Sequence, residues 1–490
     1  MPDTQKTTLS RRTLLAGIGA GGGTLTLAAY SSAEAAILPE PDRKADYDVV
    51  VIGSGAAGCA AALEAAGAGA RVVMLEKADA RWMGGNSFLA GGGFSLPLAR
   101  TAQARDDYVE DYTTFCLGRG NAAIFRQMAE NIEEDLAWLE SHGIAFEPSV
   151  PWPPSRVQMA IASPGFFAGM PAFFRRMRAR LEEMGCDLVF ETKARQLLMD
   201  TSGAVRGVRA QGRDGLTDYR AHSVVIATGG YAGNSQILEA YSDPNAGAMM
   251  VRGIKWATGD GHGLAQQAGA GLKGMGGLMA LHIAAVDAVE TAAGQPAAVV
   301  PHAISINDAG MRFVDESLGY VMHGKAVLDQ PGQRTTLVFD QAIRERVAEG
   351  VIATFNRLGL QVHQADTLAE LAAFTGLPAD AMQQTIAAFN AAVSDGAATS
   401  AQPPKAQLAS RIETPPFYAF SPLVPGITLT FGGVMIDTDA RALEADGRVI
   451  EGLFAAGECA GATFFHDYIG GGALTQALVT GRIAGRGAVQ

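Results

Sequence analysis

The regular pattern of the chain begins with a mainly apolar run at 48–52, which has the length of a strand buried on both faces. A glycine-rich turn at 53–58 leads into an alanine-rich helical stretch from about 57 to 66, and a second strand is expected at 71–76. Because a strand, a helix and a strand follow one another, the pattern predicts a βαβ unit at the start of a parallel sheet.

The rest of the chain shows two kinds of sequence pattern. Before about 275 and after 415, helical periodicity alternates with strands that end in glycines, whereas 276–414 mixes short strands with helices. We therefore expect an α/β protein with a Rossmann-like domain built from 45–275 and 415–490, and an inserted α+β substrate domain, or cap, at 276–414. The periodicity predicts helices at 106–143, 171–184, 340–348, 367–375 and 380–395, and strands at 187–190, 204–210, 223–227, 303–307 and 336–339.

The first 35 residues have the features of an export signal. Arg11 and Arg12 precede a mildly apolar stretch at 14–29, and the segment 33–35 offers a small-x-small cleavage site. Paired arginines are typical of the twin-arginine pathway, which carries folded proteins, so we expect a periplasmic or secreted protein. No other stretch of the sequence is long and apolar enough to predict a membrane span.

Composition narrows the function classes. The formal net charge of the 490 residues is −12, which argues against nucleic acid or an anionic membrane surface as a general partner. The four cysteines at 59, 116, 186 and 459 form no C-x-x-C pair, so the sequence predicts no metal site.

The turn after the first strand carries the motif G-x-G-x-x-G at Gly53, Gly55 and Gly58. Glycines permit a tight turn and close approach of a pyrophosphate, and the following helix N-terminus offers N–H groups and a partial positive charge. Glu76 ends the second strand, where a carboxylate accepts hydrogen bonds from an adenosine ribose. The sequence therefore predicts a dinucleotide site.

Further glycine-rich segments follow at 84–93, 227–230, 452–458 and 470–474. Together these motifs resemble the flavoprotein subunits of fumarate reductase and succinate dehydrogenase and their 3-ketosteroid dehydrogenase relatives, from Asp46 to Ala488. The resemblance implies a glutathione-reductase-type FAD-binding domain. It also implies non-covalent FAD, because Gly85 stands where relatives with covalent flavin have a histidine. The expected cofactor-binding residues are Gly53, Gly55, Ala56, Ala57, Gly58, Glu76, Lys77, Gly84, Gly85, Asn86, Ser87, Gly91, Gly92, Ala227, Thr228, Gly229, Gly457, Glu458, Gly471, Ala473 and Leu474.

Three positions distinguish the branches of this family. Fumarate reductases have an arginine proton donor four residues after the Glu of Arg-Phe-x-x-Glu, an arginine before Leu-Gly-Gly and a histidine before Thr-Met-Gly-Gly. Here Tyr320, Tyr468 and Leu429 stand at those places. Because a dicarboxylate is very costly to desolvate without paired guanidinium groups, this pattern favours a neutral substrate with one carbonyl.

The same pattern resembles the 3-ketosteroid dehydrogenases, most of all the branch that desaturates the C4–C5 bond of 3-oxo-5α-steroids. That resemblance implies that the Tyr468 hydroxyl and the Gly472 N–H bind the ketone oxygen, that Tyr320 exchanges the α-proton, and that the β-hydrogen moves as hydride to flavin N5. Gly470 departs from that branch, which has a serine in a proton relay there.

Several other side chains are candidates for supporting roles. His323 and His466 are candidates to lower the pKa of a tyrosine base. Arg482 is expected to be structural. Candidate walls for an apolar substrate are Tyr112, Trp152, Phe166, Phe167, Phe173 and Phe174.

We therefore expect an FAD-dependent oxidoreductase acting, in either direction, on the CH–CH bond α,β to the carbonyl of a neutral, cyclic ketone such as a 3-ketosteroid. One alternative is the reduction or dehydrogenation of a carboxylate bound by another cation, such as Arg312 or Lys325. Another is a flavin electron-transfer subunit without its own substrate. Because the sequence has no haem, iron–sulfur or second flavin motif, the expected electron acceptor is a cytochrome, a quinone-linked carrier or oxygen.

Overall fold

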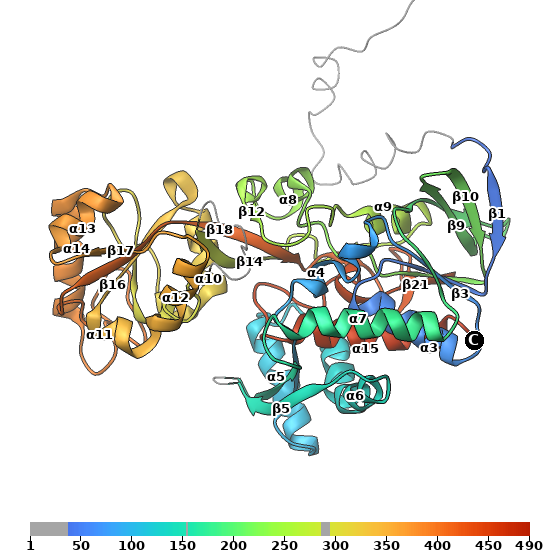
Figure 1. Cartoon of the computed structure of the whole chain (residues 1–490), viewed down its shortest axis with the longest axis horizontal. Helices are drawn as coiled ribbons and strands as arrows, with labels where there is room; N and C mark the ends of the chain where they lie inside the picture. Colours follow the sequence, from blue (N-terminus) through green and yellow to red (C-terminus); the bar gives the residue numbers. More distant parts are fainter. Residues whose placement is uncertain (1–37, 153–154, 286–294) are drawn as a thin grey trace, which may run out of the picture. The chain divides into compact units, whose positions relative to one another are not determined.

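Four consecutive buried residues form β2 (Val49–Ile52) at the centre of a six-stranded sheet (Figure 1). The strand order is β20-β21-β11-β2-β3-β7, and all neighbours pair in parallel except the edge strand β20. Such burial of both faces is typical of a parallel sheet covered on each side. The other strands are β3 (Val72–Leu75), β7 (Asp187–Val189), β11 (Ser223–Ile226), β20 (Arg441–Leu443) and β21 (Val449–Ala455).

The computed structural model describes residues 38–152, 155–285 and 295–490. The expected export signal at 1–35 lies outside the described residues. Residues 40–490 group into one compact unit. Among the helices of the described ranges, none combines the length and the apolar character that crossing a membrane requires.

The two faces of the central sheet bury different side chains, because successive strand residues point to opposite sides. Val49 and Val51 belong to a core shared with α3 (Ala56–Gly67), α7 (Gly169–Glu183) and α15 (Gly472–Gly487). Val50 and Ile52 belong to a core on the other face, which a four-stranded sheet and α9 (Asp260–Gln267) help to build. That second sheet contains β1 (Arg43–Asp46), β10 (Gly215–Arg220), β9 (Val205–Gly212) and β8 (Lys193–Met199).

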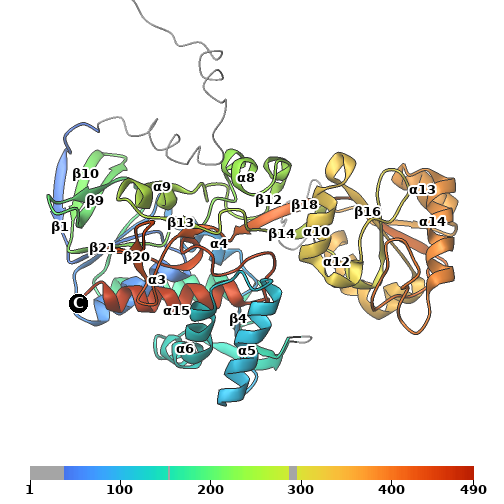
Figure 2. The ribbon, with the colours of Figure 1, turned by 180° about the vertical axis from the view of Figure 1, so that it is seen from behind.

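Helices α3 and α15 lie side by side in both views (Figures 1 and 2). A Cβ at Gly481 would lie 2.4 Å from the carbonyl oxygen of Ala57, and a Cβ at Gly485 would lie 2.4 Å from that of Ala61. The two backbones therefore touch, and the helices run in the same direction. Because Ala57 is near the start of α3 whereas Gly481 is in the second half of α15, the first turns of α15 extend beyond the start of α3.

The expected helix at 106–143 is in fact two helices, α5 (Ala102–Phe115) and α6 (Ala122–Ser141). The chain turns between them because Leu117 and Gly118 adopt left-handed φ angles of 52° and 71°. Asn121 then caps α6 by accepting hydrogen bonds from two backbone N–H groups. Both helices lie near a three-stranded antiparallel sheet of β4 (Gly93–Pro97), β5 (Phe146–Pro151) and β6 (Val157–Ala162).

The region expected as the cap is connected through two paired strands, β14 (Leu278–Ala285) and β18 (Phe417–Thr430). The long strand β18 also pairs with β12 (Met250–Val251), β16 (Thr335–Asp340) and β17 (His363–Ala365), and β16 pairs with β15 (Ile304–Ile306). A separate hydrophobic core, formed by residues between Val299 and Leu423, lies in this region.

The helices of that region include α10 (Tyr320–Leu328), α13 (Leu368–Thr375) and α14 (Ala379–Ala392). The helix expected at 340–348 does not end at 348. It begins as α11 (Gln341–Ile343), passes through a π-helical turn at Arg344–Ala348 and continues as α12 (Glu349–Arg357). The remaining helices are α4 (Gly85–Phe88) and α8 (Ser235–Tyr241), and the remaining strands are β13 (Leu272–Lys273) and β19 (Gly433–Val434).

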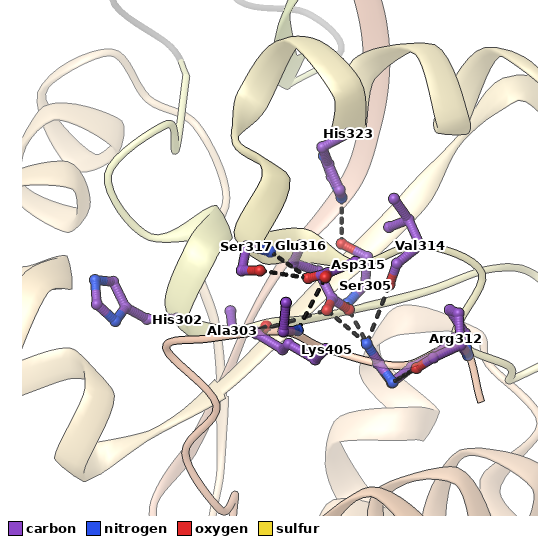
Figure 3. Close-up of polar contacts among 12 residues, drawn as sticks. His302, Ala303, Ser305, Arg312, Val314, Asp315, Glu316, Ser317, His323 and Lys405 are labelled. Atoms are coloured by element: carbon purple, nitrogen blue, oxygen red, sulfur yellow. Dashed lines mark hydrogen bonds and ion pairs between the residues drawn. The ribbon is translucent and has the colours of Figure 1, made fainter. Parts of the chain in front are cut away.

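A buried carboxylate fixes the chain just before α10 (Figure 3). Glu316 accepts hydrogen bonds from Arg312 at 2.7 and 3.1 Å and from the backbone N–H of Ser305 at 2.9 Å, and Lys405 lies 3.6 Å away. Removing one partner of such a buried charge network leaves an uncompensated charge, which is strongly destabilising. This network therefore fixes the segment that leads into Tyr320.

His323 of α10 is buried beside this network and hydrogen-bonds through Nε2 to the Ser305 hydroxyl (Figure 3). Burial, with a smaller contribution from Lys405, lowers the pKa of His323 from 6.5 to about 3. The imidazole is therefore neutral in the folded protein at neutral pH, and charging it is opposed by the fold.

We expect His323 to make the fold sensitive to acid. Below pH 6.5 the unfolded chain binds a proton that the folded chain does not bind, so this group lowers the stability by about 1.4 kcal/mol per pH unit until about pH 3. The variant His323→Gln should lose less thermal stability than the wild type between pH 7 and pH 5. Equal losses in wild type and His323→Gln would contradict the prediction.

Candidate active site

The turn between β2 and α3 forms one wall of a cavity of about 450 Å³. Gly53 has φ +104°, and a Cβ there would lie 2.4 Å from the carbonyl oxygen of Ala227. A side chain is therefore excluded at this turn by both conformation and space. Gly55 is the N-cap of α3 and, with Ala56 and Ala57, presents the first turn of the helix to the cavity. This is the arrangement in which a helix N-terminus binds a pyrophosphate.

Two carboxylates line the same cavity. Glu76, directly after β3, accepts hydrogen bonds from the Ser54 backbone N–H and hydroxyl at 3.1 and 2.7 Å, and from the Ala78 N–H at 2.8 Å. Glu458 accepts from the backbone N–H and hydroxyl of Thr430 at 2.9 and 3.1 Å. Burial raises the pKa of Glu458 to about 7. Both carboxylates are acceptors for ligand hydroxyl groups, as the ribose and ribityl parts of FAD require.

Of the expected cofactor-binding residues, all but Gly58 line the cavity. Gly58 lies behind the turn, where a Cβ would come within 2.0 Å of the Gly53 carbonyl oxygen, so its part is to let α3 approach β2. Residues from six segments of the sequence thus surround one cavity. No histidine occurs among the lining residues in the described part of the chain.

The two tyrosines singled out by the sequence, Tyr320 and Tyr468, both line this cavity. Tyr320 begins α10, and Tyr468 belongs to the loop that precedes α15. The two phenols are close enough for the charge of an ionised Tyr320 to act on Tyr468. Burial raises the pKa of Tyr320 to about 12, and burial together with Tyr320 raises that of Tyr468 well above 10. Both are therefore neutral phenols at neutral pH.

Gly472, expected as a second donor to the ketone oxygen, does not line the cavity. Its N–H donates to the carbonyl of Ile469 at 3.0 Å, and a Cβ there would lie 2.5 Å from the Tyr112 hydroxyl. Because the N–H already has an acceptor inside the turn, the structure gives no support to the role that the resemblance implied for it.

Sequence reasoning missed Arg252, which lines the cavity near both tyrosines. Its backbone N–H donates to the Ile427 carbonyl at 2.9 Å, directly after β12, and its guanidinium contacts the Thr428 hydroxyl at 3.4 Å. The residue is 4% exposed, and burial lowers its pKa from 12.5 to about 9, so it remains a cation at neutral pH. No motif surrounds Arg252 in the sequence. Its place next to the tyrosines follows only from the pairing of β12 with β18.

The walls near the tyrosines are largely apolar. Three of the six expected aromatic residues, Trp152, Phe166 and Phe167, line the cavity. Phe173 and Phe174 of α7 instead belong to the hydrophobic core, and Tyr112 is fully buried against Ser95. Met279 and Leu429 belong to the same hydrophobic cluster as Tyr320 and Tyr468, and Met159 and Ile254 also line the cavity.

The other candidate polar groups have separate roles. His323 and His466 do not line the cavity, so neither is the tyrosine's partner that the sequence suggested. Arg312 and Lys325, the candidate cations for a carboxylate substrate, do not line it either. Arg312 binds Glu316, and Lys325 donates to the His466 carbonyl. Arg482 forms buried ion pairs with Glu64 and Asp135, as expected for a structural residue.

The glycine-rich turn at 53–58, the N-terminus of α3 and the carboxylates of Glu76 and Glu458 are typical of a flavin-nucleotide-dependent oxidoreductase. The family model of an FAD binding domain matches residues 48–474, so this chain belongs to that FAD-binding family and binds FAD. The predicted family, the predicted FAD cofactor and the expected Rossmann-like fold are thereby confirmed.

The relatives in this family reduce or oxidise CH–CH bonds, and the chain is an enzyme of this kind. It is 30% identical to a fumarate reductase (cytochrome) of Shewanella frigidimarina, over 90% of this chain and 77% of that protein. It is also 30% identical to a urocanate reductase of Eggerthella lenta, over 90% of this chain and 74% of that protein. The solved 3-ketosteroid-Δ4-(5α)-dehydrogenase of Rhodococcus jostii RHA1 is similar with a TM-score of 0.70 and 25% identity, over 93% and 99% of the two chains.

We expect Gly53→Ala to bind FAD more weakly, because the new methyl group would push the turn at 53–58 away from Ala227. Gly69→Ala is the matched control, since Gly69 also has a positive φ of +90° but has no atom near its Cβ position. The ratio of flavin to protein absorbance after purification, and the FAD dissociation constant of the refilled proteins, measure the effect. A rise of about tenfold or more in that constant for Gly53→Ala alone is expected, which corresponds to about 1.4 kcal/mol. Equal FAD retention by both variants would contradict the assignment.

Proposed function

We propose that this enzyme transfers hydrogen across a carbon–carbon bond conjugated with a single carbonyl-type oxygen group. The observation that carries the proposal is that Tyr320 and Tyr468 line the same cavity beside apolar walls. These are the two side chains to which the resemblance to ketosteroid dehydrogenases assigns proton exchange and carbonyl binding. The structural similarity to a solved dehydrogenase of that kind supports the same reading.

FAD, when bound, supplies or accepts the hydride. In the proposed reaction the Tyr468 hydroxyl donates a hydrogen bond to the carbonyl oxygen, where negative charge develops as the conjugated bond reacts. Tyr320 exchanges a proton with the carbon α to that carbonyl. The apolar walls formed by Trp152, Phe166 and Leu429 contact the body of the substrate and exclude water.

Burial raises the pKa of Tyr320 to about 12, so the side chain is a neutral phenol at neutral pH. A neutral phenol can donate a proton to the α-carbon during reduction of the double bond, and it accepts that proton back in the reverse reaction.

The substrate class has two candidates. A neutral, cyclic ketone such as a 3-ketosteroid fits two phenols and apolar walls. Arg252 is the specific observation that favours the second, a monocarboxylate, and the similarity to a urocanate reductase supports it. A dicarboxylate is disfavoured, because the other cations that line the described cavity, Lys77 and Lys193, are paired with Asp260.

The proposed electron partner is a cytochrome, a quinone-linked carrier or oxygen. All three match a chain whose sequence shows a single flavin site. A pure electron-transfer subunit is the weaker proposal, because such a protein needs no substrate cavity. Here two phenols and a guanidinium line the cavity together with the residues expected to bind FAD.

We expect Tyr320→Phe and Tyr468→Phe to lower turnover while FAD stays bound. Loss of a general acid costs about 10²- to 10⁴-fold, and loss of an oxyanion donor about 10²- to 10³-fold. Dithionite-reduced enzyme should be mixed anaerobically with unsaturated ketones and carboxylates, and flavin reoxidation followed by absorbance. Tyr47→Phe, which removes a phenol bonded to Asp187 outside the cavity, is the control. Wild-type rates in both cavity variants, on a substrate that the wild type turns over, would contradict the assignment.

We further propose that residues 1–35 direct export of the folded enzyme, and that FAD is bound before transport. Replacing both Arg11 and Arg12 by Lys should leave the holoenzyme in the cytoplasm, because the pathway recognises the paired guanidinium groups. Cell fractionation with flavin fluorescence as the readout measures this. Unchanged export of the double-Lys variant would contradict the proposal.

A further inference from the structure

The loop before α15 places a carboxylate beside the two phenols of the cavity. Asp467 is partly exposed and does not itself line the cavity, and its Oδ1 accepts the backbone N–H of Tyr468 at 2.7 Å. The charge of Asp467 acts on both Tyr320 and Tyr468. Asp467 therefore has access to solvent and lies close to both side chains that the proposed reaction uses.

Contacts from two helices hold this loop in place. His466 has a left-handed φ of 66°, which turns the chain just before Asp467. The thiol of Cys116, at the end of α5, donates to the Asp467 carbonyl at 3.4 Å. From α10, the Lys325 ammonium donates to the His466 carbonyl. Because α10 begins with Tyr320, the helix that carries this phenol also binds the loop that carries the carboxylate.

The carboxyl group of Asp467 titrates near neutral pH. Burial raises its pKa to about 6, while the Tyr468 N–H and the charge of Lys325 oppose part of that rise. The groups that face it are Lys325 and Tyr320 of α10, Tyr468 of its own loop, and the Cys116 thiol, whose pKa burial raises to about 11. A group with a pKa close to the working pH both gives and takes up a proton readily, so Asp467 is suited to proton transfer.

The proposed reaction creates a need for such a group. When Tyr320 gives its proton to the α-carbon, it becomes a tyrosinate in a largely apolar cavity, which burial disfavours. The next turnover needs the phenol again. On the other side of Tyr468, Gly470 adds no polar side chain, and the Trp152 Nε1 lies 3.3 Å from where its Cβ would be. This leaves the partly exposed side of the loop, where Asp467 lies, for the supply of the proton.

We propose that Asp467 is a positioning residue that passes protons between the solvent and Tyr320. This inference rests on the proposed function and names the route of its proton. After Tyr320 has given its proton to the α-carbon, the O–H bond of the Asp467 carboxyl group breaks as the O–H bond of Tyr320 forms again. The Asp467 carboxylate then takes a proton from the solvent. Only protons move in these two steps, and the reverse order removes the proton when the double bond is formed.

The test separates the first turnover from the later ones. Tyr320 is a phenol at the start, so the first turnover does not need Asp467, whereas each later turnover does. Anaerobic holoenzyme with an excess of reduced methyl viologen is mixed with 4-androstene-3,17-dione, 2-cyclohexen-1-one or cinnamate. The product formed per flavin is followed with time by rapid quenching, and the FAD content of each protein is measured.

The proteins are wild type, Asp467→Asn, Asp467→Ser, Asp467→Glu, Tyr320→Phe and a control, Asp329→Asn. Asp329 is the exposed C-cap of α10, and it does not line the cavity. Burial raises its pKa as well, so the control removes a comparable carboxyl group from the same helix end to end.

We expect Asp467→Asn and Asp467→Ser to complete the first turnover within about twofold of the wild-type rate and then to slow by about tenfold or more. One product per flavin should therefore form in a burst. Asp467→Glu should recover part of the later rate, because it returns a carboxyl group. Asp329→Asn should match the wild type in both phases.

Two outcomes would overturn the inference and keep the proposed function. One is equal slowing of the first and later turnovers in Asp467→Asn and Asp467→Ser, which would assign the residue to the fold of the loop. The other is the wild-type rate in both phases. Tyr320→Phe tests the proposed function itself and should slow the first turnover. A wild-type first turnover in Tyr320→Phe, or a wild-type enzyme that reduces none of the three probes, would overturn the proposed function together with this inference.

Discussion

Helix α3 is packed so closely against its neighbours that three of the contacts are possible only with glycine. Gly58 faces the carbonyl of Gly53, and Gly481 and Gly485 of α15 face the carbonyls of Ala57 and Ala61. Any Cβ at these positions would come within 2.4 Å of a backbone oxygen, a distance that no small rearrangement accommodates. This backbone contact fixes α15 relative to α3 and the turn at Gly53, and residues of both helices line the same cavity.

The position of Tyr320, which lines the cavity, depends on a different constraint. Tyr320 is the first residue of α10, and a helix terminus is a place where the backbone readily frays. Here the preceding segment is fixed by Glu316, whose carboxylate binds Arg312 and the Ser305 N–H in a fully buried network (Figure 3). The proposed proton donor thus has its position set by a charge network that does not itself line the cavity.

The sequence predicted the cofactor site well because the relevant signals are local. The strand, the glycine turn and Glu76 lie within one βαβ unit, and their spacing alone fixes their relative positions. The tyrosines were found because they stand beside recognisable motifs. Arg252 has no motif beside it, and it reaches the tyrosines only through the pairing of β12 with β18, which is a long-range property of the sheet. The role of Gly472 stays a prediction, and only the coordinates show that its N–H also closes a turn with Ile469. The break between α5 and α6 was missed because the apolar periodicity hides the left-handed pair Leu117 and Gly118.

The arrangement of these parts accounts for a family that keeps one cofactor and changes its substrates. The residues expected to bind FAD lie in or next to β2, β3, β11, β21 and α15. Arg252, Leu429 and Met279 instead lie in or next to β12, β18 and β14. A substitution on the second set changes the charge and shape of the substrate end without moving the glycine contacts that hold FAD. Because the cofactor residues and the substrate residues lie on separate elements, relatives with the same fold can be named for fumarate, for urocanate and for ketosteroids.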